Sequence, residues 1–341
     1  MRALVFSSFG GPLTVETVPD PICPPAGVVV RVGATGVCRS DWHGWQGHDP
    51  DVRLPHVPGH ELAGTVEAVG SLVRRWSVGD RVTVPFVCAC GSCAVCVGGD
   101  PQVCPSQTQP GFTHWGSFAT YVTLDAADVN LVRLPLDMDF STAASLGCRF
   151  ATAYRAVVQV GAVRPEEWVV VHGCGGVGLS AVQVAVAHGA RVAAVDVSAE
   201  ALSLASSFGA VAVIDASSED VVPAVLSVTG GGAALSLDCL GSAATCADSV
   251  LCLAPRGRHV QVGLLPGGPT PLPMDRVISR ELELLGSHGM AASSYPAMLS
   301  LVASGALRPD LLVTREIGLD DAADALRDVG RVSGVTVVTS F

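Results

Sequence analysis

A glycine-rich turn in the second half of the chain restricts the possible fold more than any other feature of the sequence. The apolar segment Trp168–His172 has the composition of a buried strand, HGCGGVG follows at 172–178, and a helical pattern continues to His188. A strand, a tight turn and a helix in this order supply free backbone N–H groups that can hold a pyrophosphate. The sequence therefore predicts a dinucleotide-binding turn, formed by Gly173, Gly175, Gly176, Val177 and Gly178.

Strand-like and helix-like segments alternate from residue 151 onward. Such alternation predicts a parallel sheet that is covered by helices on both faces. The expected strands are 168–172, 191–195, 212–214, 235–239, 259–263 and 281–286, and the first expected helices are 178–188 and 199–208. Two further helices, at 295–305 and 320–330, precede a last β run at 335–340.

The first half of the chain has a different pattern. Short β-rich runs are separated by Gly and Pro, which is typical of a compact all-β unit. These runs are 28–32, 65–69, 81–85 and 118–123. A chain of 341 residues is long enough for two domains of ordinary size. We therefore expect an α/β protein that combines a β domain with a parallel-sheet domain.

An acidic residue ends the second strand of the expected parallel sheet. Asp196 lies about 20 residues beyond the glycine turn, where a carboxylate accepts hydrogen bonds from an adenosine ribose. A 2′-phosphate would be repelled by this charge, and residues 197–199 offer no Arg to compensate. Asp196 therefore favours NAD. The alternative at this point is a glycine-rich turn that binds no cofactor.

Charge and composition exclude several classes of function. The formal net charge of −11 argues against a general affinity for nucleic acid or for an anionic membrane surface. All 20 positive side chains are Arg, so Schiff-base catalysis, a Walker phosphate loop and a Tyr-Lys dehydrogenase mechanism are excluded. The N-terminus lacks the pattern of a signal peptide, and the apolar stretch 169–187 is interrupted by glycines. We expect a cytoplasmic location, where clustered cysteines bind metal more often than they form disulfides.

Four cysteines occur close together in a loop of small residues. The spacing is C-x2-C-x2-C-x7-C, and the residues are Cys90, Cys93, Cys96 and Cys104. Four thiolates that can converge without a surrounding core suit a closed tetrahedral zinc site. Because such a site leaves no position for a substrate, we expect it to stabilise the loop rather than to take part in chemistry.

Three other segments end in residues that can bind metal or move protons. They are GVCRSDWH at 36–43, PGHE at 58–61 and LGC at 146–148. Two thiolates and one imidazole could hold a zinc ion that keeps one position open for an oxygen ligand. A solitary His or Cys is more often a structural residue, so none of these residues is diagnostic alone.

Taken together, these motifs resemble the zinc-dependent alcohol dehydrogenases of the medium-chain dehydrogenase/reductase superfamily. The segments GVCRSDWH, PGHE, the four-Cys loop, GSFATYV, LGC, GCGGVG and VGLLP occur in the order of that family over essentially the whole chain. The resemblance implies a GroES-like β-barrel catalytic domain at 1–149, with a structural zinc loop at 88–105. It also implies a Rossmann NAD-binding domain at 150–286, a segment 287–341 that completes the catalytic domain, and an active site in a cleft between the domains.

The resemblance also implies roles for individual residues. Cys38, His60 and Cys148 correspond to the ligands of a catalytic zinc, and Glu61 to a carboxylate that can approach the metal. Asp41 would orient His60, and Ser40 and His43 would carry the alcohol proton to solvent through the nicotinamide ribose. The remaining residues would contact NAD, with Arg39 at the pyrophosphate and the backbone of Val262, Gly263 and Leu264 at the carboxamide.

The substrate pocket differs from that of better-known relatives. Asp49 stands where microbial relatives tend to place a large aromatic residue, while Phe86 and Phe112 remain as apolar walls. The implied reaction is reversible hydride transfer between a primary or secondary alcohol and NAD, which gives an aldehyde or ketone. The implied assembly is a homotetramer or dimer joined near residues 266–278, with two zinc ions per chain.

Other functions compete with this interpretation. A polyol dehydrogenase would commonly have a carboxylate as its third ligand, so Cys148 favours simple alcohols. A zinc-free quinone or enoyl reductase would have no need of Cys38, His60 and Cys148 together. A zinc module that binds nucleic acid would need a basic surface, which the net charge of −11 opposes.

Overall fold

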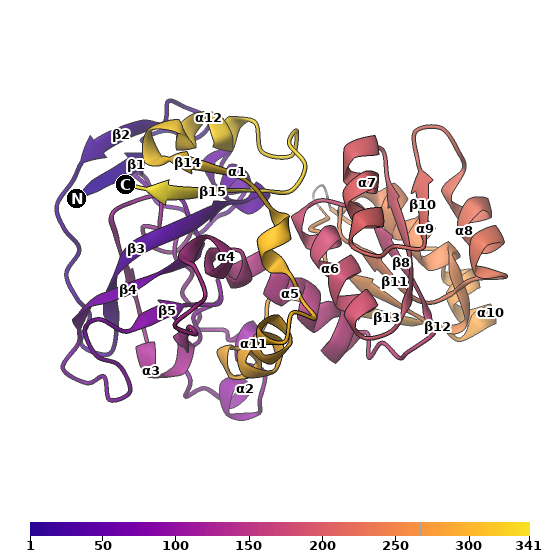
Figure 1. Ribbon diagram of the computed structural model, residues 1–341, viewed down its shortest axis with the longest axis horizontal. Coiled ribbons are helices and arrows are strands. Elements are labelled where there is room, and N and C mark those ends of the chain that lie inside the picture. Colours follow the sequence, from indigo (N-terminus) through magenta and orange to yellow (C-terminus); the bar gives the residue numbers. More distant parts are fainter. Residues whose placement is uncertain (266–267) are drawn as a thin grey trace. The chain divides into compact units, whose positions relative to one another are not determined.

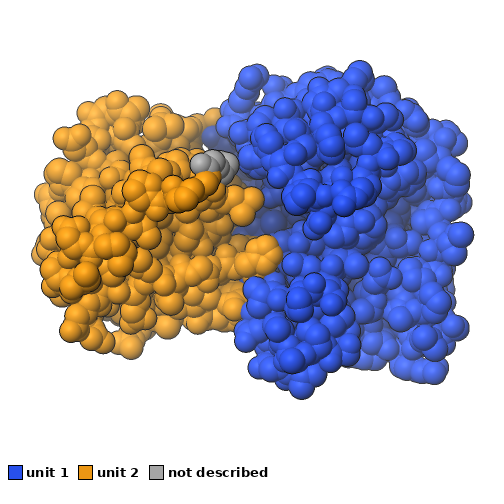
Figure 2. All heavy atoms as spheres, turned by 180° about the vertical axis from the view of Figure 1, so that it is seen from behind, with its two compact units in different colours: residues 1–151, 289–299, 309–341 blue, residues 152–288, 300–308 orange. Residues whose placement is uncertain are grey.

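The computed structural model describes residues 1–265 and 268–341, which divide into two compact units. Unit 1 comprises residues 1–151, 289–299 and 309–341, and unit 2 comprises residues 152–288 and 300–308 (Figures 1 and 2). The sequence predicts boundaries after residues 149 and 286, whereas residues 150–151 belong to unit 1 and residues 287–288 and 300–308 belong to unit 2. The largest difference lies at α11 (Tyr295–Ala303), which begins in unit 1 and ends in unit 2.

Unit 2 contains a six-stranded sheet in the order β10-β9-β8-β11-β12-β13. Each neighbouring pair is parallel, and the order reverses between β8 and β11, which is the doubly wound arrangement. The predicted parallel sheet is confirmed. Its strands are β8 (Trp168–His172), β9 (Arg191–Asp196), β10 (Ala212–Asp215), β11 (Ala233–Asp238), β12 (Leu253–Gln261) and β13 (Glu283–Gly286).

Helices alternate with these strands along unit 2 (Figure 1). The side chains of Val169, Val170 and Val171 in β8 are fully buried, as expected for a central strand covered on both faces. Ser198 is the N-cap of α7, and its hydroxyl accepts a hydrogen bond from the backbone N–H of Ala201. The helices are α6 (Gly176–Ala187), α7 (Ala199–Ser207), α8 (Val221–Thr229), α9 (Ala243–Leu251) and α10 (Met274–Arg280).

Unit 1 contains a mostly antiparallel sheet in the order β14-β15-β3-β4-β5-β7, and β6 also pairs with β3. The last strand, β15, pairs with β3, so the C-terminal segment completes the sheet formed by the first part of the chain. A separate pair comprises β1 (Arg2–Val5) and β2 (Thr14–Thr17). The sheet strands are β3 (Val28–Val37), β4 (Glu61–Val69), β5 (Arg81–Thr83), β6 (Tyr121–Leu124), β7 (Val132–Arg133), β14 (Val313–Gly318) and β15 (Val335–Ser340).

Two apolar clusters support the sheet of unit 1. One includes Phe6, Phe118 and Leu326, and the other includes Val30 and Leu62.

The α-helices of unit 1 are short: α1 (Arg39–Trp45), α2 (Ala94–Val97), α3 (Ala127–Asn130), α4 (Phe140–Ala144) and α12 (Ala322–Arg327). A π-helical turn, η2 (Leu146–Phe150), leads into α5 (Ala151–Tyr154) and a second such turn, η3 (Arg155–Val160). The remaining turns are 3-10 helices: η1 (Pro101–Val103), η4 (Ala292–Ser294), η5 (Pro309–Leu312) and η6 (Leu319–Asp321).

Within the described ranges, no helix combines the length and the apolar character that are needed to cross a membrane.

Candidate functional site

One buried carboxylate connects the two segments that carry the first candidate ligands. β3 ends at Val37, and Cys38 is the N-cap of α1. Asp41, in the first turn of α1, accepts a hydrogen bond from the backbone N–H of Cys38 at 3.0 Å through Oδ2. Its Oδ1 accepts the backbone N–H of Gly59 at 3.0 Å and Nδ1–H of His60 at 2.7 Å. Asp41 therefore holds the start of α1 and the segment before β4 in one arrangement.

Four side chains converge beside this carboxylate. Cys38, His60, Glu61 and Cys148 each place a potential ligand atom within 4.8 Å of those of the other three. Because Nδ1 of His60 donates to a carboxylate, Nε2 carries a free lone pair, and this buried atom has no hydrogen-bond partner. A buried acceptor without a partner beside two thiols is what a metal-binding imidazole needs.

The electrostatics of the cluster also favour a cation. A hydrogen bond from Cys148 lowers the pKa of the Cys38 thiol well below its ordinary value, against the effect of burial, and the charges of Arg149 and His60 act in the same direction. The hydrogen bond to Cys38 and burial raise the pKa of Cys148 well above its ordinary value. The hydrogen bond between the two sulfurs thus favours the thiolate of Cys38 over that of Cys148, and a divalent cation would allow both to ionise. Two thiolates and an imidazole fit zinc with one position left open.

Glu61 is held by a residue that the sequence analysis missed. The backbone N–H and Nε–H of Arg149 both donate to Oε1 of Glu61 at 2.9 Å, and Nη2 pairs with Oε2. Both side chains are buried. The resemblance assigned Glu61 a possible approach to the metal, whereas the structure engages both of its oxygens with a guanidinium. An Arg directly after Cys148 in an otherwise apolar segment was the available signal.

The candidate proton carriers lie on α1, immediately after Cys38. Ser40 and His43 are three residues apart, so they share a face of the helix. Burial lowers the pKa of His43, with help from the charges of Arg39 and His48, although Cys38 acts in the opposite direction. The imidazole of His43 is therefore neutral and able to accept a proton near pH 7.

The other residues predicted for the first unit fall into two groups. The rings of Phe86 and Phe112 lie 6.2 and 5.3 Å from the ring of His60, so they form apolar walls beside the cluster. Asp49 instead accepts the backbone N–H of Asp51 at 2.9 Å within a local turn. Arg39 is exposed, stacks 4.0 Å from the ring centre of Trp42 and donates to the carbonyl of Val329 at 3.2 Å.

The four-Cys loop brings its thiols together at the distances of a metal site. The Sγ–Sγ distances are 3.9 Å for Cys90–Cys96, 3.4 Å for Cys93–Cys96, 3.8 Å for Cys93–Cys104 and 3.5 Å for Cys90–Cys104. A tetrahedral site with Zn–S bonds of about 2.3 Å requires about 3.8 Å between sulfurs. All four thiols are free. The backbone N–H groups of Ser92 and Cys93 lower the pKa of Cys90 to about 6, which favours the thiolate that zinc binds.

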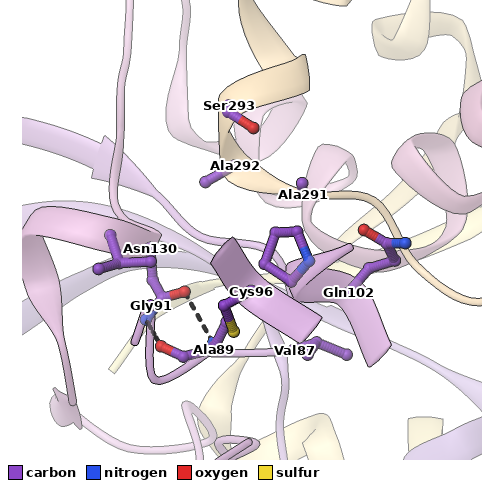
Figure 3. A pocket seen from close by; sticks show the side chains of 11 residues that line it. Val87, Ala89, Gly91, Cys96, Gln102, Asn130, Ala291, Ala292 and Ser293 are labelled. Atoms are coloured by element: carbon purple, nitrogen blue, oxygen red, sulfur yellow. Dashed lines mark hydrogen bonds between the residues drawn. The ribbon is translucent and has the colours of Figure 1, made fainter. Parts of the chain in front are cut away.

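A cavity of about 170 Å³ lies beside this loop (Figure 3). Figure 3 shows Cys96 among its lining residues, together with Asn130 and the segment 291–293. Asn130 donates to the carbonyl of Ala89 at 2.9 Å and accepts its N–H at 2.8 Å, so it fixes the chain just before Cys90. Asn130, in the wall of the cavity, therefore supports the start of the four-Cys loop.

The glycine turn of unit 2 has the geometry expected of a nucleotide site. A side chain at Gly178 would place its Cβ only 1.8 Å from the carbonyl oxygen of Gly173, so α6 can approach the turn only with glycine at this position. A Cβ at Gly175, the N-cap of α6, would meet nothing within 4 Å. The turn is therefore tightly packed between Gly173 and Gly178 and open at Gly175, the helix N-terminus, where a pyrophosphate would bind.

Asp196 lies at the end of β9 beside this turn. Its Oδ2 accepts the backbone N–H of Cys174 at 2.6 Å, and its Oδ1 accepts that of Ser198 at 2.8 Å. The structure therefore joins the acidic residue to the glycine turn, as expected for a ribose-binding carboxylate.

Residues 262–264 are expected to contact the carboxamide of the nicotinamide ring, and two of them already form hydrogen bonds within the protein. The backbone N–H groups of Val262 and Gly263 both donate to the carbonyl of Asp238, at 3.0 and 2.8 Å, and the carbonyl of Gly263 accepts from Gln261. Leu264 is exposed. Of the segment expected at a subunit interface, Pro266 and Gly267 lie outside the described residues.

Comparisons with known proteins agree with this geometry. Residues 24–135 match the model of the alcohol dehydrogenase GroES-like domain, and residues 176–304 match that of zinc-binding dehydrogenases. An alcohol dehydrogenase of Rhizobium meliloti is 39% identical over 84% of each chain, and an NAD-dependent alcohol dehydrogenase of Sulfurisphaera tokodaii is 33% identical over 98% of each. The solved structure of alcohol dehydrogenase TADH from Thermus sp. ATN1 is 32% identical, covers both chains completely and has a TM-score of 0.93. The predicted combination of a GroES-like and a Rossmann-type domain is confirmed.

Proposed function

The chain belongs to the zinc-binding alcohol dehydrogenases of the medium-chain superfamily, and from this premise we propose that it oxidises primary or secondary alcohols with NAD. One observation carries the proposal: the ligand atoms of Cys38, His60 and Cys148 lie close together, and the buried Nε2 of His60 has no hydrogen-bond partner. In each turnover the alcohol loses a hydride to NAD and a proton to the protein, which gives an aldehyde or ketone and NADH. The reverse reaction reduces a carbonyl compound.

The residues of unit 1 have separate tasks in this reaction. A zinc ion held by Cys38, His60 and Cys148 would act as a Lewis acid that makes the alcohol hydroxyl more acidic. Asp41 keeps the proton of His60 on Nδ1 and so leaves Nε2 available as a ligand. Ser40 would accept the alcohol proton while its own hydroxyl proton moves, through the nicotinamide ribose, to His43, which passes a proton on to solvent. Phe86 and Phe112 favour substrates with an apolar group.

The residues of unit 2 hold the cofactor. The open N-terminus of α6 binds the pyrophosphate, and Asp196 binds the adenosine ribose. NAD supplies the hydride acceptor when it is bound. We also propose a second zinc in the four-Cys loop, a cytoplasmic location, and a homotetramer or dimer whose chains are joined near residues 266–278.

The direct test combines a substrate screen with metal analysis. Primary, secondary, aromatic and terpenoid alcohols are supplied with NAD, and NADH is followed by its absorbance. We expect NADH formation with at least one class and two zinc ions per chain by elemental analysis. Treatment with a zinc chelator should abolish turnover. Full activity after complete removal of the metal would contradict the proposal.

The preference for NAD provides a separate prediction. A hydrogen bond to a charged group contributes about 1.5–3 kcal/mol, so Asp196 should favour NAD over NADP by about 10- to 100-fold in kcat/KM. Asp196→Asn should reduce this preference, because the amide keeps an acceptor for the turn but loses the charge that repels a 2′-phosphate. Asp215→Asn, at the end of the adjacent strand β10, is the control and should leave the ratio unchanged. A wild-type preference for NADP would remove this role from Asp196.

A further inference from the structure

The end of helix α1 brings a second histidine against His43. The backbone N–H of His48 donates to the carbonyl of His43 at 3.0 Å, and that of Gly47 donates to Gly44 at 3.1 Å. Gly47 has φ +78, so the two bonds form a Schellman motif. In this motif the side chains at the positions of His43 and His48 commonly contact each other, usually through apolar groups. Here both are imidazoles.

The two imidazoles form a hydrogen bond. Nδ1 of His43 lies 2.9 Å from Nδ1 of His48, so one of these atoms carries a proton and the other accepts it. Each ring therefore keeps Nε2 for another partner. His43 is half-buried, whereas His48 is exposed to solvent. The pair provides a path from the partly buried ring to water.

Trp42 fixes both rings. Its indole packs edge-on against His43, with 5.1 Å between ring centres, and against His48 at 5.7 Å. Arg39 lies over the same indole at 4.0 Å and donates to the carbonyl of Val329. The Schellman motif thus fixes the backbone of His48, and the contact with Trp42 fixes its imidazole.

We infer that His48 is the outer member of a two-histidine proton relay, which takes the alcohol proton from His43 and releases a proton to water. The proton enters at Nε2 of His43, the proton on Nδ1 of His43 moves to Nδ1 of His48, and Nε2 of His48 gives up its proton to solvent. One proton enters and one leaves, and the reverse sequence supplies the proton for carbonyl reduction. His48 acts only through His43: it takes a proton from that ring and passes a proton to solvent. This inference rests on the proposed function.

The decisive variant is His48→Gln. A glutamine at 48 can still form a hydrogen bond with His43, but it cannot carry a proton at neutral pH. At pH 7 in dilute buffer we expect kcat for alcohol oxidation to fall about tenfold, less than the 10²- to 10⁴-fold of a whole acid–base catalyst. Added imidazole should restore most of the loss, because a small base can collect the proton from His43.

The control is His114→Gln, also in unit 1. His114 contacts Thr113 and the carbonyl of Thr123, outside the path described above. This variant should therefore keep the wild-type kcat, and added imidazole should change the kcat of neither protein. If His48→Gln also keeps the wild-type kcat in dilute buffer, His48 carries no proton and the inference is wrong.

A measurement independent of turnover tests the pair itself. In protein labelled with 15N-histidine, magnetic resonance should show one proton shared between Nδ1 of His43 and Nδ1 of His48, and His48→Gln should shift the 15N signals of His43. Absence of the shared proton would overturn the relay even in an active enzyme. Absence of NADH formation by the wild type would instead reject the proposed function, so the two failures are distinguishable.

Discussion

Replacement of Cys38 by Ser should abolish alcohol oxidation and leave the protein folded. The substitution removes a thiolate from the three-residue ligand set but keeps a good N-cap for α1. A Lewis acid contributes several kcal/mol to such a reaction, so kcat/KM should fall by at least about 10³-fold. The measurements are NADH formation with the best alcohol, zinc content and thermal unfolding. Zinc should fall from two ions toward one per chain, with little change in Tm.

Cys93→Ser is the matched control, because it removes a thiol from the other cluster. This variant should also lose one zinc, but its main effect should be a lower Tm, since the four-Cys loop takes no part in the chemistry. A Cys38→Ser protein that retains most of its activity would show that the catalytic zinc assignment is wrong. Equal losses of activity and of Tm in both variants would contradict the division into a catalytic and a structural site.

Replacement of Arg149 by Met should produce the largest loss of stability. The guanidinium neutralises Glu61, whose side chain is 0% exposed, and Met fills a similar volume without charge. Removal of one partner of a buried ion pair costs about 3–5 kcal/mol, because the other charge remains buried and unpaired. Urea denaturation of the zinc-loaded protein measures the free energy of unfolding. An unchanged unfolding midpoint would contradict this account of the pair.

Two further variants separate the pair from a general loss of packing. Arg149→Met combined with Glu61→Gln should recover part of the stability, since the uncompensated charge is gone. Arg256→Met removes a pair with Glu281 in which both side chains are 72% exposed, and it should change the unfolding midpoint little.

The parts of the protein that depend on short-range patterns could be predicted from the sequence. The glycine turn and the four-Cys loop each contain their own signal within a few residues, whereas the roles of Cys38 and His60 followed from the order of several motifs along the chain. The contact of Asp41 with His60 was expected from the resemblance, and the structure contains it at 2.7 Å. The parallel sheet followed from the alternation of strands and helices.

Features that depend on contacts between distant segments could not be predicted. Arg149 pairs with a residue 88 positions away, and its sequence neighbourhood gives no sign of that partner. The contact of His48 with His43 has no signal in the sequence either, because it requires the left-handed turn at Gly47. The helical stretch from α4 to η3 was also missed, since its Ala and Val residues carry no clear period.

Helix α1 is fixed at both ends, at the start by Asp41 and at the end by the turn at Gly47. An inserted or deleted residue would rotate everything beyond it by about 100° around the helix axis. His43 would then no longer face the same side as Ser40. The length of the stretch from Cys38 to His48 is therefore as constrained as the residues that it carries, and a one-residue insertion or deletion between Ser40 and His43 should be as damaging as the loss of one of these side chains.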